Sequence, residues 1–223
     1  MQLIAAIPTK ASRQLRLVIQ RLNNYAEESI QRYYRQIQTD PETAPDTLLS
    51  KDFENMDRGD ISYPQLVANA RGNIIAGTDS TAITATYATW LLSQNPQIEK
   101  HLIVEAKSLP ASYTDDDLRS IKYLTYVIQE ALRFRPPIAE RLPRVVPTGG
   151  STIAGTFIPG GIVVGVPTWS LHRDPQVWKE PEEFMPGRWE NATREMRDSF
   201  VPFGGGSRGK TCIFTKVTLL SSD

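Results

Sequence analysis

Apolar side chains recur at helical spacing through most of the first 135 residues. From Ala11 to Gln38 they fall three or four positions apart, with charged residues between them, which predicts an amphipathic helix. A shorter helix is predicted within Glu42–Ser50, and a polar turn at Asp57–Asp60. The longest run extends from Tyr63 to about Leu92 and carries few charges after Arg71. It predicts a long central helix that is buried on most sides.

Two more helices follow, and then the character of the chain changes. Gln97–Lys107 and Leu118–Phe134 keep the helical period; Asp115–Asp117 can cap the second helix, and Pro136–Pro137 ends it. Short β-prone segments separated by glycine-rich turns come next: Arg144–Val146, Ser151–Ile153 and Ile162–Val166. From residue 174 to residue 209 the chain is rich in proline, glycine and aromatic residues, which favours an ordered coil over disorder.

The composition excludes several classes of function. Lys plus Arg and Asp plus Glu number 25 each, so no net field attracts nucleic acid or an anionic membrane. The single cysteine, Cys212, excludes an internal disulfide and fits a reducing compartment. One cysteine and two histidines are too few for a clustered zinc site. No segment is long enough to cross a bilayer, so we expect no membrane anchor in this chain.

A polar segment, Ala76-Gly77-Thr78-Asp79-Ser80-Thr81, interrupts the long apolar run. Glycine, a carboxylate and hydroxyls oppose both helix propensity and burial there. One interpretation is a helix with an exposed polar stripe whose hydroxyls bond back to the preceding turn. The other is a local distortion, where Gly77 lets a ligand approach and the polar groups relay protons.

Three charged residues could form one ion-pair network. Glu130 and Arg133 share a helix face by their spacing, although most such pairs are exposed and contribute little. Arg188 lies between proline, glycine and tryptophan, where it could join the pair or stack on the tryptophan at the surface. Both alternatives are open at this point.

A glycine-rich segment, Phe203-Gly204-Gly205-Gly206-Ser207-Arg208-Gly209-Lys210-Thr211-Cys212, precedes the end of the chain. Residues 204–211 fit the nucleotide-binding pattern G-x-x-x-x-G-K-T, which requires a strand before it and a helix after it. The preceding residues, 199–203, contain a proline and do not read as a clean strand. A P-loop nucleotide binder is therefore a distant alternative.

Taken in order, these features resemble the cytochrome P-450 family of haem-thiolate monooxygenases, of a fungal microsomal style. The polar helix segment is similar to the family's oxygen-activating segment, Glu130 and Arg133 to its Glu-x-x-Arg pair, and Arg188 to the arginine that joins that pair. The glycine-rich segment resembles its haem-ligand loop, Phe-Gly-x-Gly-x-Arg-x-Cys. Intervening stretches are similar too: Arg141–Val145, Phe157–Gly161 and Leu171–Pro175 through Trp189.

The resemblance implies a mainly α fold with small β segments, a partial cytochrome P-450 fold that lacks its N-terminal half and C-terminal end. It implies one partial domain over residues 1–223. Within it, 1–62 would be a helical lead-in, 63–135 the helical core, 136–170 a β-rich segment, and 171–223 the meander and cysteine loop.

Residue roles follow from the same resemblance. Cys212 would be the thiolate ligand of the iron of haem b. The other haem-binding positions would be Arg208, Arg144, Phe203, Gly204, Gly206, Ala76 and Gly77. Asp79, Ser80 and Thr81 would deliver protons to bound dioxygen, with Ser80 standing where threonine is usual. Glu130, Arg133 and Arg188 would be structural, fixing the coil that carries the cysteine. Residues 68–76 and 138–142, mainly apolar, would line the substrate pocket.

The implied reaction inserts one oxygen atom from O2 into a lipophilic organic substrate, with electrons from an NADPH-dependent reductase. The full-length family type resides in the endoplasmic reticulum membrane. Without an anchor, this chain would be cytoplasmic or of unknown location.

Departures from the family pattern support an alternative, a truncated or mis-spliced remnant without haem. Three residues separate Arg208 from Cys212 where the family has one, and Phe214 stands where the family has glycine. The chain then ends at Asp223, which would leave only a stub of the following helix.

Overall fold

The computed structural model of the protein describes residues 9–45 and 47–205. These residues fall into two compact units that divide between Asp79 and Ser80. The architecture is mainly α with small β segments, as the sequence predicts. The predicted division into one domain with four segments stays a prediction. No helix of the described residues is long and apolar enough to cross a membrane.

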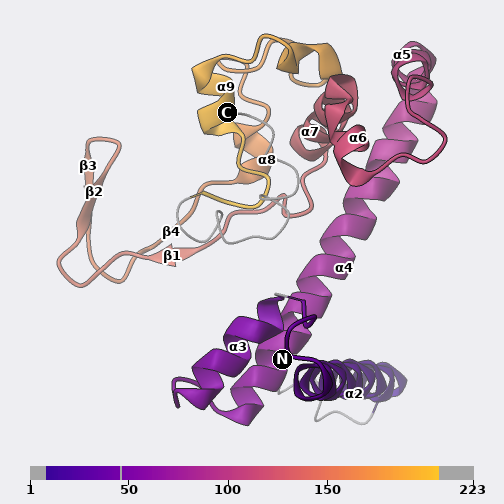
Figure 1. The fold of residues 1–223 in the computed structure, drawn as a ribbon. Coiled ribbons are helices and arrows are strands. Elements are labelled where there is room, and N and C mark those ends of the chain that lie inside the picture. The colour runs from indigo at the N-terminus through magenta and orange to yellow at the C-terminus, as the bar shows by residue number, and fades with distance from the viewer. Residues whose placement is uncertain (1–8, 46, 206–223) are drawn as a thin grey trace. The chain divides into compact units, whose positions relative to one another are not determined.

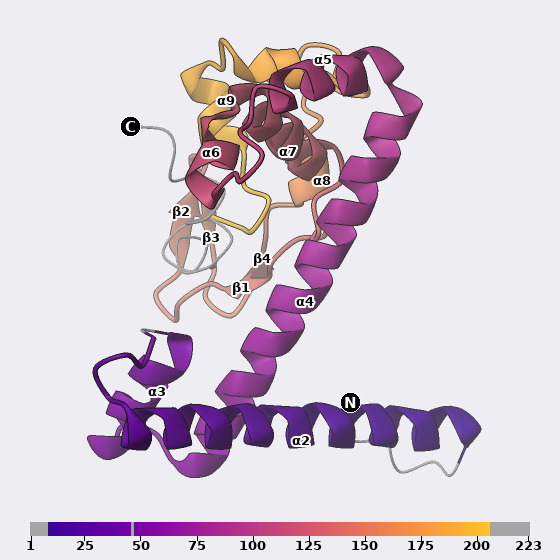
Figure 2. The same ribbon diagram turned by 45° about the vertical axis from the view of Figure 1, so that its right-hand side comes forward.

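The first unit consists of α2 (Lys10–Thr39), α3 (Leu48–Asp57) and the start of α4 (Tyr63–Gln94) (Figures 1 and 2). Helix α2 confirms the predicted amphipathic helix, and Thr9 caps it by accepting a hydrogen bond from the Ser12 amide. Helix α3 begins later than the Glu42–Ser50 prediction because its capping box is formed by Thr47 and Ser50. The core of the unit consists of Ala26, Ile30, Phe53, Leu66 and Ala70.

Helix α4 confirms the predicted long helix but not its burial. Only Leu66, Ala70 and Leu91 are buried along its length, because described elements cover it near its two ends. Of the two interpretations of residues 76–81, the structure agrees with the helix that continues without a break, since α4 is α-helical throughout this segment. Farther along α4, the hydroxyl groups of Thr84, Thr86 and Thr89 donate to carbonyls four residues earlier, as Thr84 Oγ1 does to the Ser80 oxygen at 2.8 Å.

Three helices follow α4 in the second unit. Helix α5 (Pro96–Ala106) matches its prediction within one residue, whereas the predicted helix 118–134 is two helices, α6 (Asp115–Ser120) and α7 (Lys122–Phe134). The break occurs at Ile121, which is extended and buried. Thr114 is the N-cap residue of α6, and one of the predicted aspartates, Asp117, completes the capping box by accepting a hydrogen bond from the Thr114 amide. Leu91, Val127, Ala131 and Phe184 form a buried hydrophobic cluster in this part of the chain.

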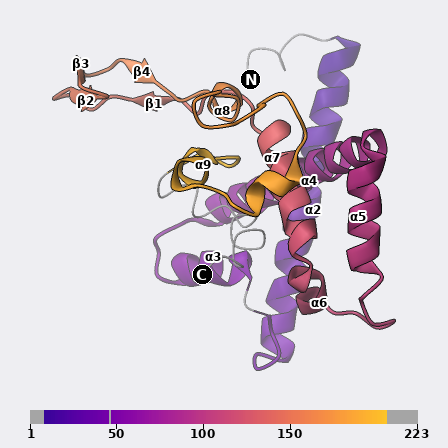
Figure 3. The same ribbon diagram turned by 90° about the horizontal axis from the view of Figure 1, so that it is seen from above.

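Two small antiparallel sheets follow α7. Strand β1 (Arg144–Val145) pairs with β4 (Val163–Val164), and β2 (Ser151–Ile153) pairs with β3 (Thr156–Ile158). The sequence predicts β1, β2 and β4 but not β3. The β2–β3 hairpin lies away from α7 in Figures 1 and 3.

The remaining segment is an ordered coil with three short helices: α8 (Thr168–Leu171), a 3₁₀ helix η1 (Pro186–Trp189) and α9 (Arg194–Ser199). The aromatic prediction holds, because Trp178 and Trp189 form a buried cluster with Ala192 and Met196, on which Phe200 packs. This cluster and α7 hold the coil in one conformation.

Candidate functional site

Glu130, on the buried face of α7, accepts five hydrogen bonds. Arg133 Nη2, the Met185 amide and Arg188 Nε donate to its Oε1 at 2.9, 3.0 and 3.0 Å. Arg133 Nε and Trp189 Nε1 donate to its Oε2, both at 2.9 Å. The side chain has no exposed surface, so the five donors replace the water that the carboxylate loses on folding.

Arg133 uses all five of its N–H groups, and its side chain is also fully buried. Two of them hold Glu130 in a forked contact. The other three donate to backbone carbonyls of the coil, those of His172, Pro181 and Glu183, at 2.8, 2.9 and 3.0 Å. Arg133 therefore fixes three points of the coil to α7.

Arg188 completes the network from the 3₁₀ helix. Its Nε is 3.0 Å from Glu130 Oε1, and its side chain is only 8% exposed. Its Nη groups donate to the carbonyls of Lys179, Glu180 and Glu183. The three residues that the sequence proposed as a network thus lie in contact, and the surface alternatives for the Glu130 pair and for Arg188 are excluded.

This network has one carboxylate for two guanidinium groups, and carbonyl dipoles balance the second cation. Removing one partner of such a buried pair leaves an uncompensated charge, which is strongly destabilising. The arrangement therefore serves as a rigid clamp on residues 179–189 rather than as a reactive centre.

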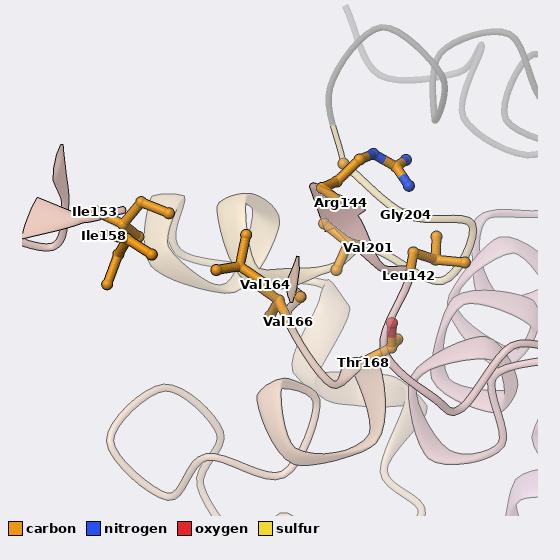
Figure 4. A pocket seen from close by; sticks show the side chains of 11 residues that line it. Leu142, Arg144, Ile153, Ile158, Val164, Val166, Thr168, Val201 and Gly204 are labelled. Carbon is orange, nitrogen blue, oxygen red and sulfur yellow. The ribbon is translucent and has the colours of Figure 1, made fainter. Parts of the chain in front are cut away.

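A pocket of about 410 Å³ lies where β1, β4 and the start of the glycine-rich segment meet (Figure 4). Its lining is mostly aliphatic: Leu142, Ile153, Ile158, Val164, Val166 and Val201, with Arg144, Thr168 and three glycines. Figure 4 places Ile153 and Ile158 at one end of the view, and Leu142, Arg144 and Gly204 at the other.

Arg144 supplies the cation of this pocket. Its side chain is exposed, and its Nη1 donates to the Pro143 carbonyl at 2.8 Å. Within residues 9–45 and 47–205 no carboxylate forms an ion pair with it. Its guanidinium can therefore bind a carboxylate or phosphate of a ligand.

Gly204 is at a position that only glycine suits. Its φ is +86°, and a Cβ built there would lie 2.6 Å from Leu142 Cδ1. Phe203 directly precedes it in a turn, and residues 200–205 contain no strand. The strand that a P-loop requires is thus absent at this point of the described chain.

The other predicted residues are placed as follows. Ala76, Gly77, Asp79, Ser80 and Thr81 lie on successive turns of α4; Gly77 and Ser80 are half-buried and the others are exposed. Gly206, Arg208 and Cys212 lie outside the described residues. Nowhere in residues 9–45 and 47–205 do three potential metal-binding side chains gather.

Two side chains that sequence reasoning missed are central to the site. The Trp189 indole binds Glu130, and His172 contacts both Arg133 and Val201. Both residues lie in the coil that is rich in aromatic residues, and a buried ring nitrogen there requires a hydrogen-bond partner. That requirement could have marked both as members of the site.

Comparison with known proteins assigns the chain to a family. The family model for cytochrome P450 matches residues 1–213. The chain belongs to the cytochrome P450 family. It is similar to "Cytochrome P450 monooxygenase orf2" of Aspergillus niger, with 38% identity over 89% of this chain and 40% of the relative. It is also similar to "Cytochrome P450 monooxygenase tazI" of Aspergillus terreus, with 40% identity over 86% of this chain and 40% of the relative.

A third relative, "Cytochrome P450 monooxygenase azaI" of Aspergillus niger, is 36% identical over 89% of this chain and 46% of its own length. This cytochrome P450 chain therefore spans less than half the length of these fungal relatives.

The described residues fit the haem group that the cytochrome P450 family implies. The pocket pairs an aliphatic lining with the Arg144 guanidinium, the combination that an apolar macrocycle bearing carboxylates requires. Gly204, where a Cβ would meet Leu142, lets the backbone of the glycine-rich segment run close to β1. The thiolate position, Cys212, lies outside the described residues, so this fit concerns the edge of the group only.

Proposed function

We propose that the protein to which this chain corresponds is a haem-dependent monooxygenase that acts on a lipophilic organic substrate. The observation that carries the proposal is the buried network of Glu130, Arg133 and Arg188. In a chain of this family, such a clamp fixes the coil that leads to the only cysteine. Apolar packing could hold the coil at least as well as these buried charged groups. The network therefore has a benefit only if the coil must position a ligand of the residues that follow it.

Three sets of residues would hold the cofactor. Cys212 would provide the thiolate, and the guanidinium groups of Arg144 and Arg208 would bind the carboxylates of haem b. Phe203, Gly204 and Gly206 would shape the loop beside the sulfur. Bound haem would activate O2, one atom of which would enter the substrate.

Residues of α4 would handle protons. Asp79 is exposed and the adjacent Ser80 is half-buried, so a proton would pass from solvent through Asp79 to the Ser80 hydroxyl group. Thr81 adds a second hydroxyl. Ala76 and Gly77 present little bulk one turn earlier, where the cofactor would approach the helix.

The apolar character of residues 68–76 and 138–142 supports a lipophilic substrate. An NADPH-dependent reductase would supply the electrons. For the full-length protein we propose the endoplasmic reticulum membrane as its location.

The test is a spectrum of the purified chain, loaded with haem, reduced and treated with carbon monoxide. A thiolate-ligated iron gives a red-shifted Soret band, and the Cys212→Ser variant should lose it. A chain without that band, and with the same spectrum as Cys212→Ser, would be a remnant without catalytic function.

A deletion variant tests the unusual loop spacing. Removing Lys210 and Thr211 leaves one residue between Arg208 and the cysteine. A red-shifted band in this variant but not in the parent chain would assign the loss of function to the two extra residues. Transcript sequencing across codons 208 to 214 would then show whether those residues are present in the natural message.

A further inference from the structure

His172 is a buried residue at the end of α8 that uses both ring nitrogens. The Val201 amide donates to Nε2 at 3.0 Å, and Nδ1 lies 3.2 Å from the Arg133 carbonyl oxygen. A backbone N–H is always a donor, so Nε2 must carry the lone pair. Nδ1 then carries the proton and donates to Arg133. The two partners fix the neutral Nδ1–H tautomer.

The two contacts join parts of the chain that are far apart in sequence. Arg133 is in the last turn of α7, and Arg133 Nη1 also donates to the His172 carbonyl at 2.8 Å. Val201 lies three residues before Gly204. The imidazole also stacks on Phe200, with centroids 5.5 Å apart and planes at 26°.

An anchor at Val201 has a physical purpose. Beyond it, Pro202 has no amide proton to donate, and the glycines from residue 204 onward have no side chains to pack. The direction in which the chain enters the glycine-rich segment must therefore be fixed before those residues.

We propose that His172 is a positioning residue, whose neutral Nδ1–H imidazole links Arg133 to Val201 and so directs the segment that leads to Cys212. The consequence for the cysteine rests on the proposed function; the link itself does not. Loss of the Val201 contact should loosen the segment while the Glu130 network stays intact.

The surroundings keep the ring neutral. Burial above all, with the nearby guanidinium groups of Arg133 and Arg173, lowers the pKa of His172 to about 4, against the opposing effect of the hydrogen bond to the Arg133 carbonyl. Those two arginines are the charged groups that face the ring within the described chain. At neutral pH the lone pair on Nε2 is therefore available to Val201.

Two substitutions separate the two contacts. Glutamine can place Oε1 near the position of Nε2 and accept from Val201, whereas asparagine can place its amide near Nδ1 and donate to Arg133 but cannot reach Val201. Amide hydrogen exchange at Val201, followed by NMR in the chain without haem, should stay near the parent rate in His172→Gln. It should accelerate at least tenfold in His172→Asn. The exposed histidine in His101→Asn is the matched control and should leave Val201 unchanged.

Equal exchange at Val201 in the Gln and Asn variants would overturn the link. If neither variant folds, the nitrogen-15 shifts of the imidazole in the unsubstituted chain decide the matter, because an Nε2–H tautomer contradicts the proposal.

With haem added, His172→Asn should show a smaller red-shifted Soret band than His172→Gln. Equal bands despite different exchange at Val201 would refute the positioning of Cys212 but leave the link. Failure of the parent chain to bind haem would refute the proposed function alone.

Discussion

Arg133 grips the carboxylate of Glu130, one helical turn earlier, with Nε and Nη2, both at 2.9 Å, and neither side chain has any exposed surface. The same guanidinium holds three carbonyls of the coil. The pair thus converts a local helical contact into a tertiary clamp on a segment that has little regular secondary structure of its own.

Substituting Glu130→Gln should destabilise the chain by about 3–5 kcal/mol. The amide removes the negative charge, leaves the buried guanidinium groups of Arg133 and Arg188 uncompensated, and turns an NH2 group toward donors. Urea unfolding measures the loss. The control is Asp198→Asn, which breaks an ion pair whose side chains are 89% and 72% exposed and should change stability by less than about 0.5 kcal/mol. Equal midpoints for the two variants would contradict the clamp.

Substituting Arg133→Lys keeps the charge but loses the fork. An ammonium has three donors for the five acceptor contacts of Arg133, so at least two buried oxygens lose a partner. At about 1–3 kcal/mol for each, the free energy of unfolding should fall by about 2 kcal/mol or more. Arg194→Lys, at an exposed pair, provides the comparison. A lysine variant as stable as that one would show that charge alone maintains the network.

The sequence predicts the helices well where periodicity is strong, and fails where a backbone conformation is unusual. It does not predict β3 because the β2–β3 turn uses Ala154 and Gly155, both with positive φ, and alanine gives no turn signal. It does not predict the break at Ile121 because burial, not a helix breaker, favours the extended conformation there.

The network of Glu130, Arg133 and Arg188 also depends on a feature that the sequence does not predict. The spacing of Glu130 and Arg133 places them on one face, but it cannot distinguish an exposed pair from a buried one. The carbonyls of residues 172–183 make the difference, and their position depends on tertiary packing. The role of His172 could not be predicted for the same reason, since its hydrogen-bond partners Arg133 and Val201 are 39 and 29 residues away in the sequence.

Acid should destabilise the chain through His172. Its pKa is about 4 in the folded chain, against 6.5 as the ordinary value, so between these values the unfolded chain binds a proton that the folded chain does not. The contribution is complete above pH 6.5 and falls as the pH drops toward 4, by up to about 3 kcal/mol.

The pH dependence of urea unfolding, compared between variants, isolates this contribution from that of the carboxylates. His172→Gln should flatten the slope in this window, whereas His101→Gln should retain it. Identical slopes in the two variants would show that His172 ionises normally in the folded chain.

Gly204→Ala should lower the free energy of unfolding by about 1–2 kcal/mol, the cost of left-handed backbone for a residue with a Cβ. The new methyl group would also push Leu142, whose Cδ1 lies 2.6 Å from the Cβ position, toward the pocket that both residues line. Gly205→Ala is the matched control, because its φ is not positive and its Cβ would meet Val201 at an ordinary 4.0 Å. That variant should stay within about 0.5 kcal/mol of the parent in urea unfolding.

Adding Leu142→Ala to Gly204→Ala removes the overlap but not the backbone cost. A double variant no less stable than Leu142→Ala alone would therefore mean that the segment can avoid the positive φ, and that Gly204 is needed only for space.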